Sequence, residues 1–145
     1  MNELNQQQLQ MCDIQGRLFE LSLKNGYDSP AFIKAFMNSK AAVALDDTYD
    51  RLQWAGEEYI LEELNEEVGG LTPAGKTFSN EVLYWTGYTY RYWHYYTGES
   101  SKEILQIAGP DIMNHSWLGF HTLSVNMAID DLKDIYKKKK WRLHS

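Results

Sequence analysis

Thirteen residues near the middle of the chain, 84–96, carry six of its ten tyrosines and two of its five tryptophans. A segment with so much ring area must pack against other elements or bind a partner, so it constrains the fold more than any other stretch. Ser79 offers a helix cap before the segment, and Thr97-Gly98 offers a helix stop after it. We therefore predict a helix over 80–97. The alternative is a half-buried β-ribbon over 88–95, because Tyr, Trp and Thr favour strands.

Cap and stop signals divide the rest of the chain into further helices. Apolar residues at mixed three- and four-residue spacing predict a first helix over residues 3 to about 24, which Asn25-Gly26 ends. Asp28-Ser29-Pro30 begins a short second helix, with proline at its first position. The remaining predicted elements are a helical turn over 41–45, a long helix from Asp46 or Asp47 through Val68, a loop over 71–78, a short helix from the capping box Ser100-Ser101-Lys102-Glu103 to Gly109-Pro110, a helix or turn over 111–119, and a last helix from Ser124.

The sequence thus predicts one all-α domain over 1–145, a compact orthogonal bundle of about five to seven helices with a basic tail from about residue 137. An apolar fraction of 43% excludes a disordered chain, and no apolar run approaches the ~18 residues of a membrane span. The first residues lack the pattern of a secretory signal, and the single cysteine, Cys12, leaves no internal disulfide. We therefore expect a cytoplasmic protein without a membrane segment.

Charge is distributed unevenly along the chain. Residues 46–67 hold nine acids and a single basic residue, Arg51, and they carry more negative charge than the whole chain, whose net charge is -6. The compensating positive charge lies near the C-terminus, at Lys133, Lys137 to Lys140 and Arg142. A nucleic-acid binder normally carries a basic stripe over most of one face, so nucleic acid is an unlikely partner.

The aromatic segment splits into two faces when it is placed on a helix at 100° per residue. One face reads as core and contains Val82, Trp85, Thr89, Tyr92, Trp93 and Tyr96. The opposite face contains Leu83, Tyr84, Gly87, Arg91, His94 and Tyr95. The candidate partner- or ligand-binding residues are Tyr84, Gly87, Tyr88, Arg91, His94 and Tyr95. There Arg91 could fix an anion, His94 could exchange a proton, and Gly87 would let a ligand or another backbone approach. The competing interpretation is a packed helix whose Arg91 and His94 are satisfied by nearby acids.

A buried ion pair between Glu57 and Arg91 is the partner we expect within that packed arrangement. Glu57 would share an apolar helix face with Trp54, Leu61 and Val68, where a carboxylate must be paired or protonated. Arg91 can clamp a carboxylate with two hydrogen bonds.

Three other motifs are weak. Gly70 to Thr77 fits the formal phosphate-loop pattern, but a Glu-rich helix precedes it where the motif needs a strand. Among His94, His115 and His121 no pair has the spacing of helix-bundle metal sites, so we predict no metal and no cofactor. Cys12 falls on the buried stripe of the first helix, which favours an inert core thiol.

The run from Trp85 to Ile104, together with Gln53 to Tyr59 and Phe120-His121-Thr122, resembles small uncharacterised bacterial proteins that are accessory or antitoxin-like partners of ADP-ribosyltransferase toxins. This resemblance covers about residues 25 to 135 and brings no catalytic motif with it. It implies a protein that works by binding another protein.

We therefore expect a non-catalytic interaction module, the antitoxin of a toxin–antitoxin pair, that contacts its partner through the acidic helix and the Tyr, Trp and Arg side chains. The alternative hypothesis is a binding protein or enzyme that takes a small anionic or planar ligand on the Tyr/Arg/His face. A third is an oligomerising helical module, which leaves a homo-oligomer open.

Overall fold

The computed structural model describes residues 3–143, and within that range it contains eight α-helices, one 3-10 helix and no strand. The elements are α1 (Gln6–Lys24), α2 (Ser29–Met37), α3 (Lys40–Asp46), η1 (Arg51–Trp54), α4 (Glu57–Val68), α5 (Asn80–Thr97), α6 (Ser101–Ile107), α7 (Pro110–Phe120) and α8 (Val125–Leu143). The all-α prediction is confirmed, whereas the predicted number of five to seven helices is too low. The aromatic segment is helical and the β alternative is wrong.

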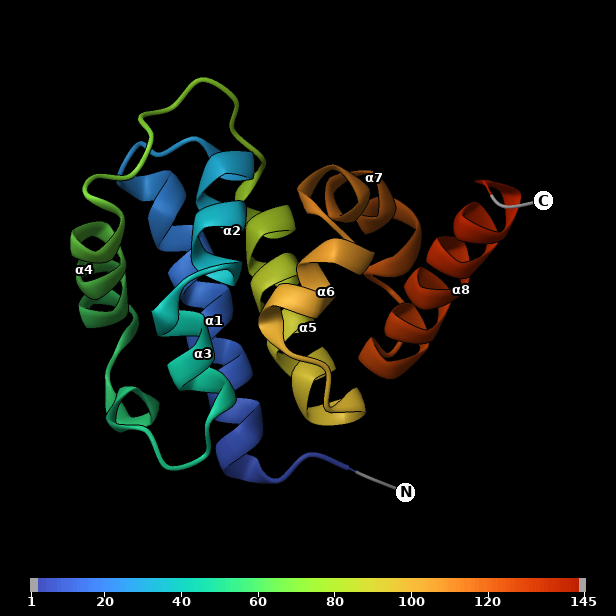
Figure 1. Ribbon diagram of the computed structural model, residues 1–145, viewed down its shortest axis with the longest axis horizontal. Coiled ribbons are helices and arrows are strands. Elements are labelled where there is room, and N and C mark those ends of the chain that lie inside the picture. Colours follow the sequence, from blue (N-terminus) through green and yellow to red (C-terminus); the bar gives the residue numbers. More distant parts are fainter. Residues whose placement is uncertain (1–2, 144–145) are drawn as a thin grey trace.

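The aromatic helix α5 lies in the middle of the molecule (Figure 1). Its most extensive contact is with α1, and α6, α7 and α8 pack against its other sides. Helix α4 packs on the side of α1 away from α5. Helices α4 and α8 thus form opposite edges of the molecule along its longest axis (Figure 1). No helix in the described range is long and apolar enough to cross a membrane.

Two glycines let α1 and α5 approach each other closely. A Cβ atom added at Gly87 would lie 2.5 Å from the Gln15 carbonyl oxygen, and one added at Gly16 would lie 2.7 Å from the Tyr84 ring. The Gln15 side-chain amide also donates to the Gly87 carbonyl oxygen at 2.9 Å. Gly87 therefore admits another backbone, which was one of the two roles expected for it.

The apolar core forms where α1, α2 and α5 meet. The Phe19 ring packs edge-on against Phe32, Phe36 and Tyr90, with centroids 5.3, 5.6 and 6.1 Å away. Cys12 is buried as expected, and desolvation raises the pKa of its thiol to about 12. Such a thiol remains protonated and unreactive at neutral pH.

Most predicted helix ends are confirmed. The side chains of Asp28, Ser79 and Ser100 cap α2, α5 and α6, and Glu103 completes the capping box of α6.

The predicted long helix from Asp46 or Asp47 through Val68 is wrong. Helix α3 ends at Asp46, Asp50 caps η1, and α4 begins only after Gly56. The Gln53 amide donates to the carbonyl oxygens of Leu45 and Asp47, both at 2.8 Å, and so takes up acceptors that a continuing helix would use.

The predicted division of α5 into a core face and an open face is also wrong. Gly87 and Arg91, expected on the open face, are buried, while Trp85, Tyr92 and Tyr96, expected in the core, are only half-buried. The reason is that α1 covers the Gly87 face and several elements surround α5, so a two-sided assignment does not apply.

Candidate protein-interaction surface

Arg91 is the centre of a buried polar network. Its side chain is 0% exposed. Its Nε donates to Gln15 Oε1 at 2.8 Å, and its Nη1 donates to Asp46 Oδ1 at 2.7 Å in a salt bridge. Asp46 also accepts hydrogen bonds from the Ser101 hydroxyl and backbone N–H, at 2.8 and 3.0 Å. The network therefore joins α1, α3, α5 and α6.

The predicted partner of Arg91 was wrong, although a buried ion pair is present. Arg91 pairs with Asp46 at the end of α3, whereas Glu57 is half-buried at the start of α4 and borders a groove with Arg17 and Lys24. The error follows from the break in the helix: Trp54 ends η1 and Glu57 begins α4, so the two residues do not share one helix face. Trp54 is exposed.

His94 belongs to the same network. Its Nδ1 lies 2.7 Å from the Glu99 carbonyl oxygen and its Nε2 lies 3.1 Å from the Asp46 carbonyl oxygen. Both ring nitrogens thus have protein partners, and Nδ1 is also 3.7 Å from the Asp46 carboxylate. An anion or a proton-exchanging ligand would have to displace these contacts.

The tyrosines of the predicted site lie apart from this network. Tyr84 and Tyr88 belong to a ladder of half-buried rings, Tyr84, Tyr88, Tyr92 and Tyr96, with successive centroids 6.0, 6.4 and 6.5 Å apart. The Tyr84 hydroxyl donates to Asp13, and burial raises the pKa of Tyr84. Tyr95 borders a cavity of only about 70 Å³. The structure thus brings Arg91 and His94 together but does not gather the six residues into one pocket.

Asp46, Gln15 and Ser101 were missed by the sequence analysis. Asp46 gave no signal, because the sequence places it at the start of a predicted long helix, where a carboxylate is favourable. It is instead the last residue of α3, where a cationic partner offsets the unfavourable helix dipole. Gln15 gave a weak signal, as a polar residue on the apolar stripe of α1.

The acidic segment forms a different surface at the edge of the molecule. We call the six glutamates of α4 the acidic ridge, namely Glu57, Glu58, Glu62, Glu63, Glu66 and Glu67. Helix α4 has no basic residue in its last turn. In the range 3–143, no side-chain hydrogen bond or ion pair involves Glu58, Glu62 or Glu66.

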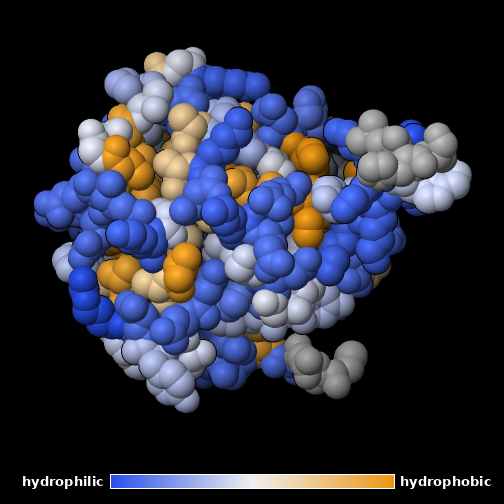
Figure 2. Space-filling view, in the orientation of Figure 1, coloured by the Kyte–Doolittle hydropathy of each residue, from blue (hydrophilic) through white to orange (hydrophobic). Residues whose placement is uncertain are grey.

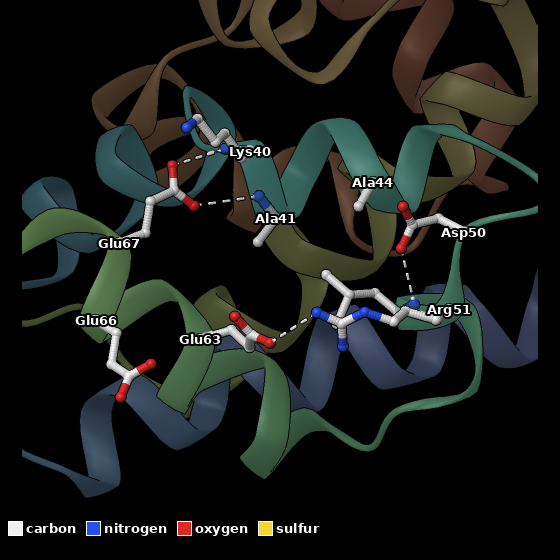
Figure 3. A pocket seen from close by; sticks show the side chains of 9 residues that line it. Lys40, Ala41, Ala44, Asp50, Arg51, Glu63, Glu66 and Glu67 are labelled. Carbon is white, nitrogen blue, oxygen red and sulfur yellow. Dashed lines mark hydrogen bonds and ion pairs between the residues drawn. The ribbon is translucent and has the colours of Figure 1, made fainter.

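A cavity of about 500 Å³ lies on one side of the ridge, between α3, η1 and α4 (Figure 3). We call it the α3–α4 cleft. Ala41, Ala44 and Leu52 contribute apolar surface to the cleft. Its charged lining consists of four carboxylates and two cations, namely Asp50, Glu63, Glu66, Glu67, Lys40 and Arg51, and is therefore acidic on balance. Figure 3 shows Glu63 directed toward Arg51 and Glu66 directed away from the carboxylates of Glu63 and Glu67.

Two of the ridge carboxylates in the cleft have structural partners. Glu67 accepts from the backbone N–H groups of Lys40 and Ala41, at 2.8 and 3.3 Å, and so caps the start of α3. Glu63 accepts from the Tyr59 hydroxyl at 2.8 Å and from Arg51 at 3.2 Å, and these hydrogen bonds lower the pKa of Glu63. Glu66 has no comparable role among the described residues.

Two adjoining hollows lie on the other side of the ridge, against α1. They have volumes of about 520 and 390 Å³ and share Leu21 and Glu58 in their walls. The ridge therefore stands between the α3–α4 cleft on one side and these two hollows on the other, and its carboxylates border all three.

Large apolar side chains are exposed on α4 and on the segment just before it. Trp54 is 78% exposed and Tyr59 is 44% exposed, and Tyr49 lies in the turn before η1 with 93% of its surface exposed. The face seen in Figure 2 is mainly hydrophilic and is interrupted by small hydrophobic patches. Exposed aromatic rings beside carboxylates can take part in both hydrophobic and cation–π contacts.

The phosphate-loop-like segment has another role. The Lys76 backbone N–H donates to Asp28 Oδ1 at 2.7 Å, and the Ser29 N–H donates to the Lys76 carbonyl oxygen at 2.8 Å. An aspartate thus occupies a backbone donor that a phosphate would need, and the segment fastens onto the start of α2. Among residues 3–143, no group of three or more His, Cys, Asp or Glu side chains is placed to hold a metal ion.

The sequence matches no protein-family model and no curated protein, and the fold matches no solved structure.

Proposed function

We propose that this protein is a non-catalytic interaction module that binds a basic segment of a partner protein on the acidic ridge and in the α3–α4 cleft. The observation that carries the proposal is the combination of unpaired ridge glutamates with the exposed rings of Trp54 and Tyr59. Charged and aromatic groups placed together in this way provide both steering and anchoring contacts.

Helix stability does not explain the unpaired glutamates. Glu58, Glu62 and Glu66 follow one another at four-residue intervals, and like charges at that spacing destabilise a helix by roughly 0.2–0.5 kcal/mol per pair. Glu66 also lies in the last turn of α4, where the helix dipole is unfavourable for an acid. A cationic partner would offset both penalties.

The chemistry of the α3–α4 cleft suits a lysine or arginine side chain. A long side chain of this kind has an aliphatic stem that can lie on Ala41, Ala44 and Leu52 while its charged end reaches Glu63 or Glu66. The Trp54 and Tyr59 rings lie next to this position in the chain and could receive further cations of the same segment.

We propose in addition that the partner is a toxin encoded nearby, so that the protein acts as its cytoplasmic antitoxin. The ridge would then cover a basic surface of the toxin, such as one that binds an anionic substrate. Co-expression with a neighbouring toxin should restore growth, and Glu63→Gln/Glu66→Gln should weaken the protection. Unchanged toxicity in the presence of the wild-type protein would contradict the antitoxin role.

Ridge binding can be tested with a fluorescein-labelled peptide of alternating lysine and leucine. Its anisotropy should rise with wild-type protein, and Glu63→Gln/Glu66→Gln should weaken binding by roughly 2- to 30-fold, from about 0.2–1 kcal/mol per exposed charge pair. Glu3→Gln/Asp134→Asn removes the same charge from exposed positions outside α4 and the hollows beside it and is the matched control.

Equal losses in the ridge and control variants would show that the peptide senses net charge alone, and the proposed site would be rejected. Binding should also weaken in salt, since exposed charges are screened within about 10 Å at 0.1 M ionic strength.

A further inference from the structure

The C-terminal half of α8 is a helical surface with little protein around it. Residues 137–142 are all exposed, and Trp141 is 72% exposed. Upstream, α8 is fixed to the core by buried Ala128, Ile129 and Leu132. The helix therefore projects from the edge of the molecule opposite α4 (Figure 1).

The projecting segment is strongly basic on all sides. Lys137, Lys138, Lys139 and Lys140 are consecutive, so their side chains leave the helix at 100° intervals around its axis. Residues 137–142 contain five cationic side chains and no acid, and Trp141 lies among them. A helix that lies on a membrane needs one apolar face, which this arrangement does not provide.

The same molecule carries the complementary surface at its other edge. Helix α4 contains six glutamates and no basic residue. The α3–α4 cleft that it borders carries four carboxylates against the two cations Lys40 and Arg51, so its lining is acidic on balance. Six helical residues span about 9 Å, which fits within the roughly 18 Å length of the twelve-residue α4. The two surfaces lie at opposite edges of one copy (Figure 1), so they can meet only between copies.

We propose that the basic end of α8 of one copy docks into the α3–α4 cleft of a second copy. Lysines of residues 137–140 face Glu63 and Glu66, and Trp141 adds apolar contact. This inference rests on the proposed function, because it uses the same cleft, and it makes the chain's own α8 a competitor of the basic partner.

The contact joins two different surfaces, so a pair of copies retains one free cleft, on the copy whose α8 is docked, and one free α8 end, on the other copy. Association of this kind is heterologous and extends into short chains unless its geometry closes a ring. Binding of a partner in the cleft would cap or dissolve these chains.

Sedimentation velocity on the full chain tests the proposal with neutralising variants. At about 0.03 M salt the wild-type protein should associate as its concentration rises, and at about 0.5 M salt it should be monomeric. Glu63→Gln/Glu66→Gln should weaken association roughly 2- to 30-fold, and Lys137→Gln/Lys138→Gln/Lys139→Gln should weaken it roughly 3- to 150-fold, from about 0.2–1 kcal/mol per exposed charge pair. Lys34→Gln/Lys102→Gln, which removes exposed lysines elsewhere, should associate like wild type.

Mixing the two weakened variants gives the sharpest result. One variant retains the basic α8 end and the other retains the acidic cleft, so an equimolar mixture should form dimers and nothing larger. A monomeric mixture, or an α8 variant that associates like wild type, overturns the proposal. Binding of a uridine oligonucleotide to the α8 end of a monomeric wild-type protein overturns it in favour of a nucleic-acid partner.

The two proposals fail separately. If the lysine–leucine peptide binds the cleft but the protein remains monomeric, the inference about α8 is wrong and the proposed function stands. If the peptide binds Glu63→Gln/Glu66→Gln as tightly as it binds wild type, the proposed function is wrong whatever the sedimentation shows.

Discussion

Arg91 holds together elements that are far apart in the sequence. Its guanidinium bonds to Gln15 of α1 and Asp46 of α3, and Ser101 of α6 shares the Asp46 carboxylate. Replacing one member of a buried pair leaves the other charge without compensation, which typically costs about 3–5 kcal/mol. We therefore expect Arg91→Ala to lower the melting temperature sharply.

Arg17→Ala is the control for Arg91→Ala. Arg17 pairs with Asp13 one turn away at 2.6 Å, and both side chains are partly exposed, so its loss should cost only about 0.3–0.5 kcal/mol. Urea unfolding curves measure both changes. Equal destabilisation of the two variants would show that the buried network does not support the fold.

Gly87 is a second residue whose role can be tested, through the α1–α5 contact. A methyl group at this position would meet the Gln15 carbonyl oxygen at 2.5 Å, so Gly87→Ala should push the helices apart and destabilise the protein by about 1–3 kcal/mol. Gly119→Ala in α7 meets nothing within 4 Å and should be neutral or stabilising by up to about 1 kcal/mol. Thermal melts that show Gly87→Ala to be as stable as Gly119→Ala would contradict this account.

Asp28 should make the free energy of unfolding rise with pH in the acidic range. Hydrogen bonds from the backbone N–H groups of Lys76 and Ala31 lower the pKa of Asp28 in the folded protein. An aspartate in the unfolded chain has a pKa of about 3.9. Because the pKa of Asp28 is lower in the folded protein, its ionised carboxylate stabilises the fold at pH values above about 3.9, and this stabilisation is lost as pH falls through the folded pKa. The stability difference between wild type and Asp28→Asn should thus be present at neutral pH and shrink below pH of about 4. A difference that is constant in urea unfolding from neutral to acidic pH would contradict this role.

At the scale of elements, local capping chemistry predicted most helices, whereas long-range contacts set what the sequence could not show. Ser79, Asp28 and the Ser100–Glu103 box act within four residues, so they can be recognised from sequence alone. The break between α3 and α4 depends on Gln53 reaching back to α3 carbonyls, which no local signal indicates. The choice of Asp46 as partner of Arg91 likewise depends on how four helices pack.

The repeated glutamates of α4 should lower the stability of the helix while they favour binding of a basic partner. Glu62 lies four residues from both Glu58 and Glu66, so Glu62→Gln should remove two repulsive pairs and stabilise the protein by about 0.4–1 kcal/mol. The same change should weaken binding of the lysine–leucine peptide by up to about fivefold. Glu81→Gln, in the first turn of α5, should be neutral or slightly destabilising, because a negative charge is favourable there. A Glu62→Gln variant that melts below wild type would show that the ridge serves the fold.

At the scale of the whole molecule, the buried core lies at the centre of the longest axis and the two charged surfaces lie at its ends. The packed pair α1–α5 occupies the centre, and the two charged surfaces proposed to bind partners lie at the edges. Edges with few buried side chains can be reshaped by a partner without disturbing the central core.

Hydrogen exchange should reveal this arrangement directly. Amides of α1 and α5 should exchange only on global unfolding, because their side chains form the core around Phe19 and Tyr90. Residues 47–55 and 137–142 should exchange fast, since most of their side chains are exposed, and so should the exposed loop 72–77. Mass spectrometry at about 0.5 M salt would measure the isolated copy, and dilution to about 0.03 M salt should protect 47–55 and 137–142 together. Protection of 137–142 without any change in 47–67 would contradict a contact between α8 and the α3–α4 cleft.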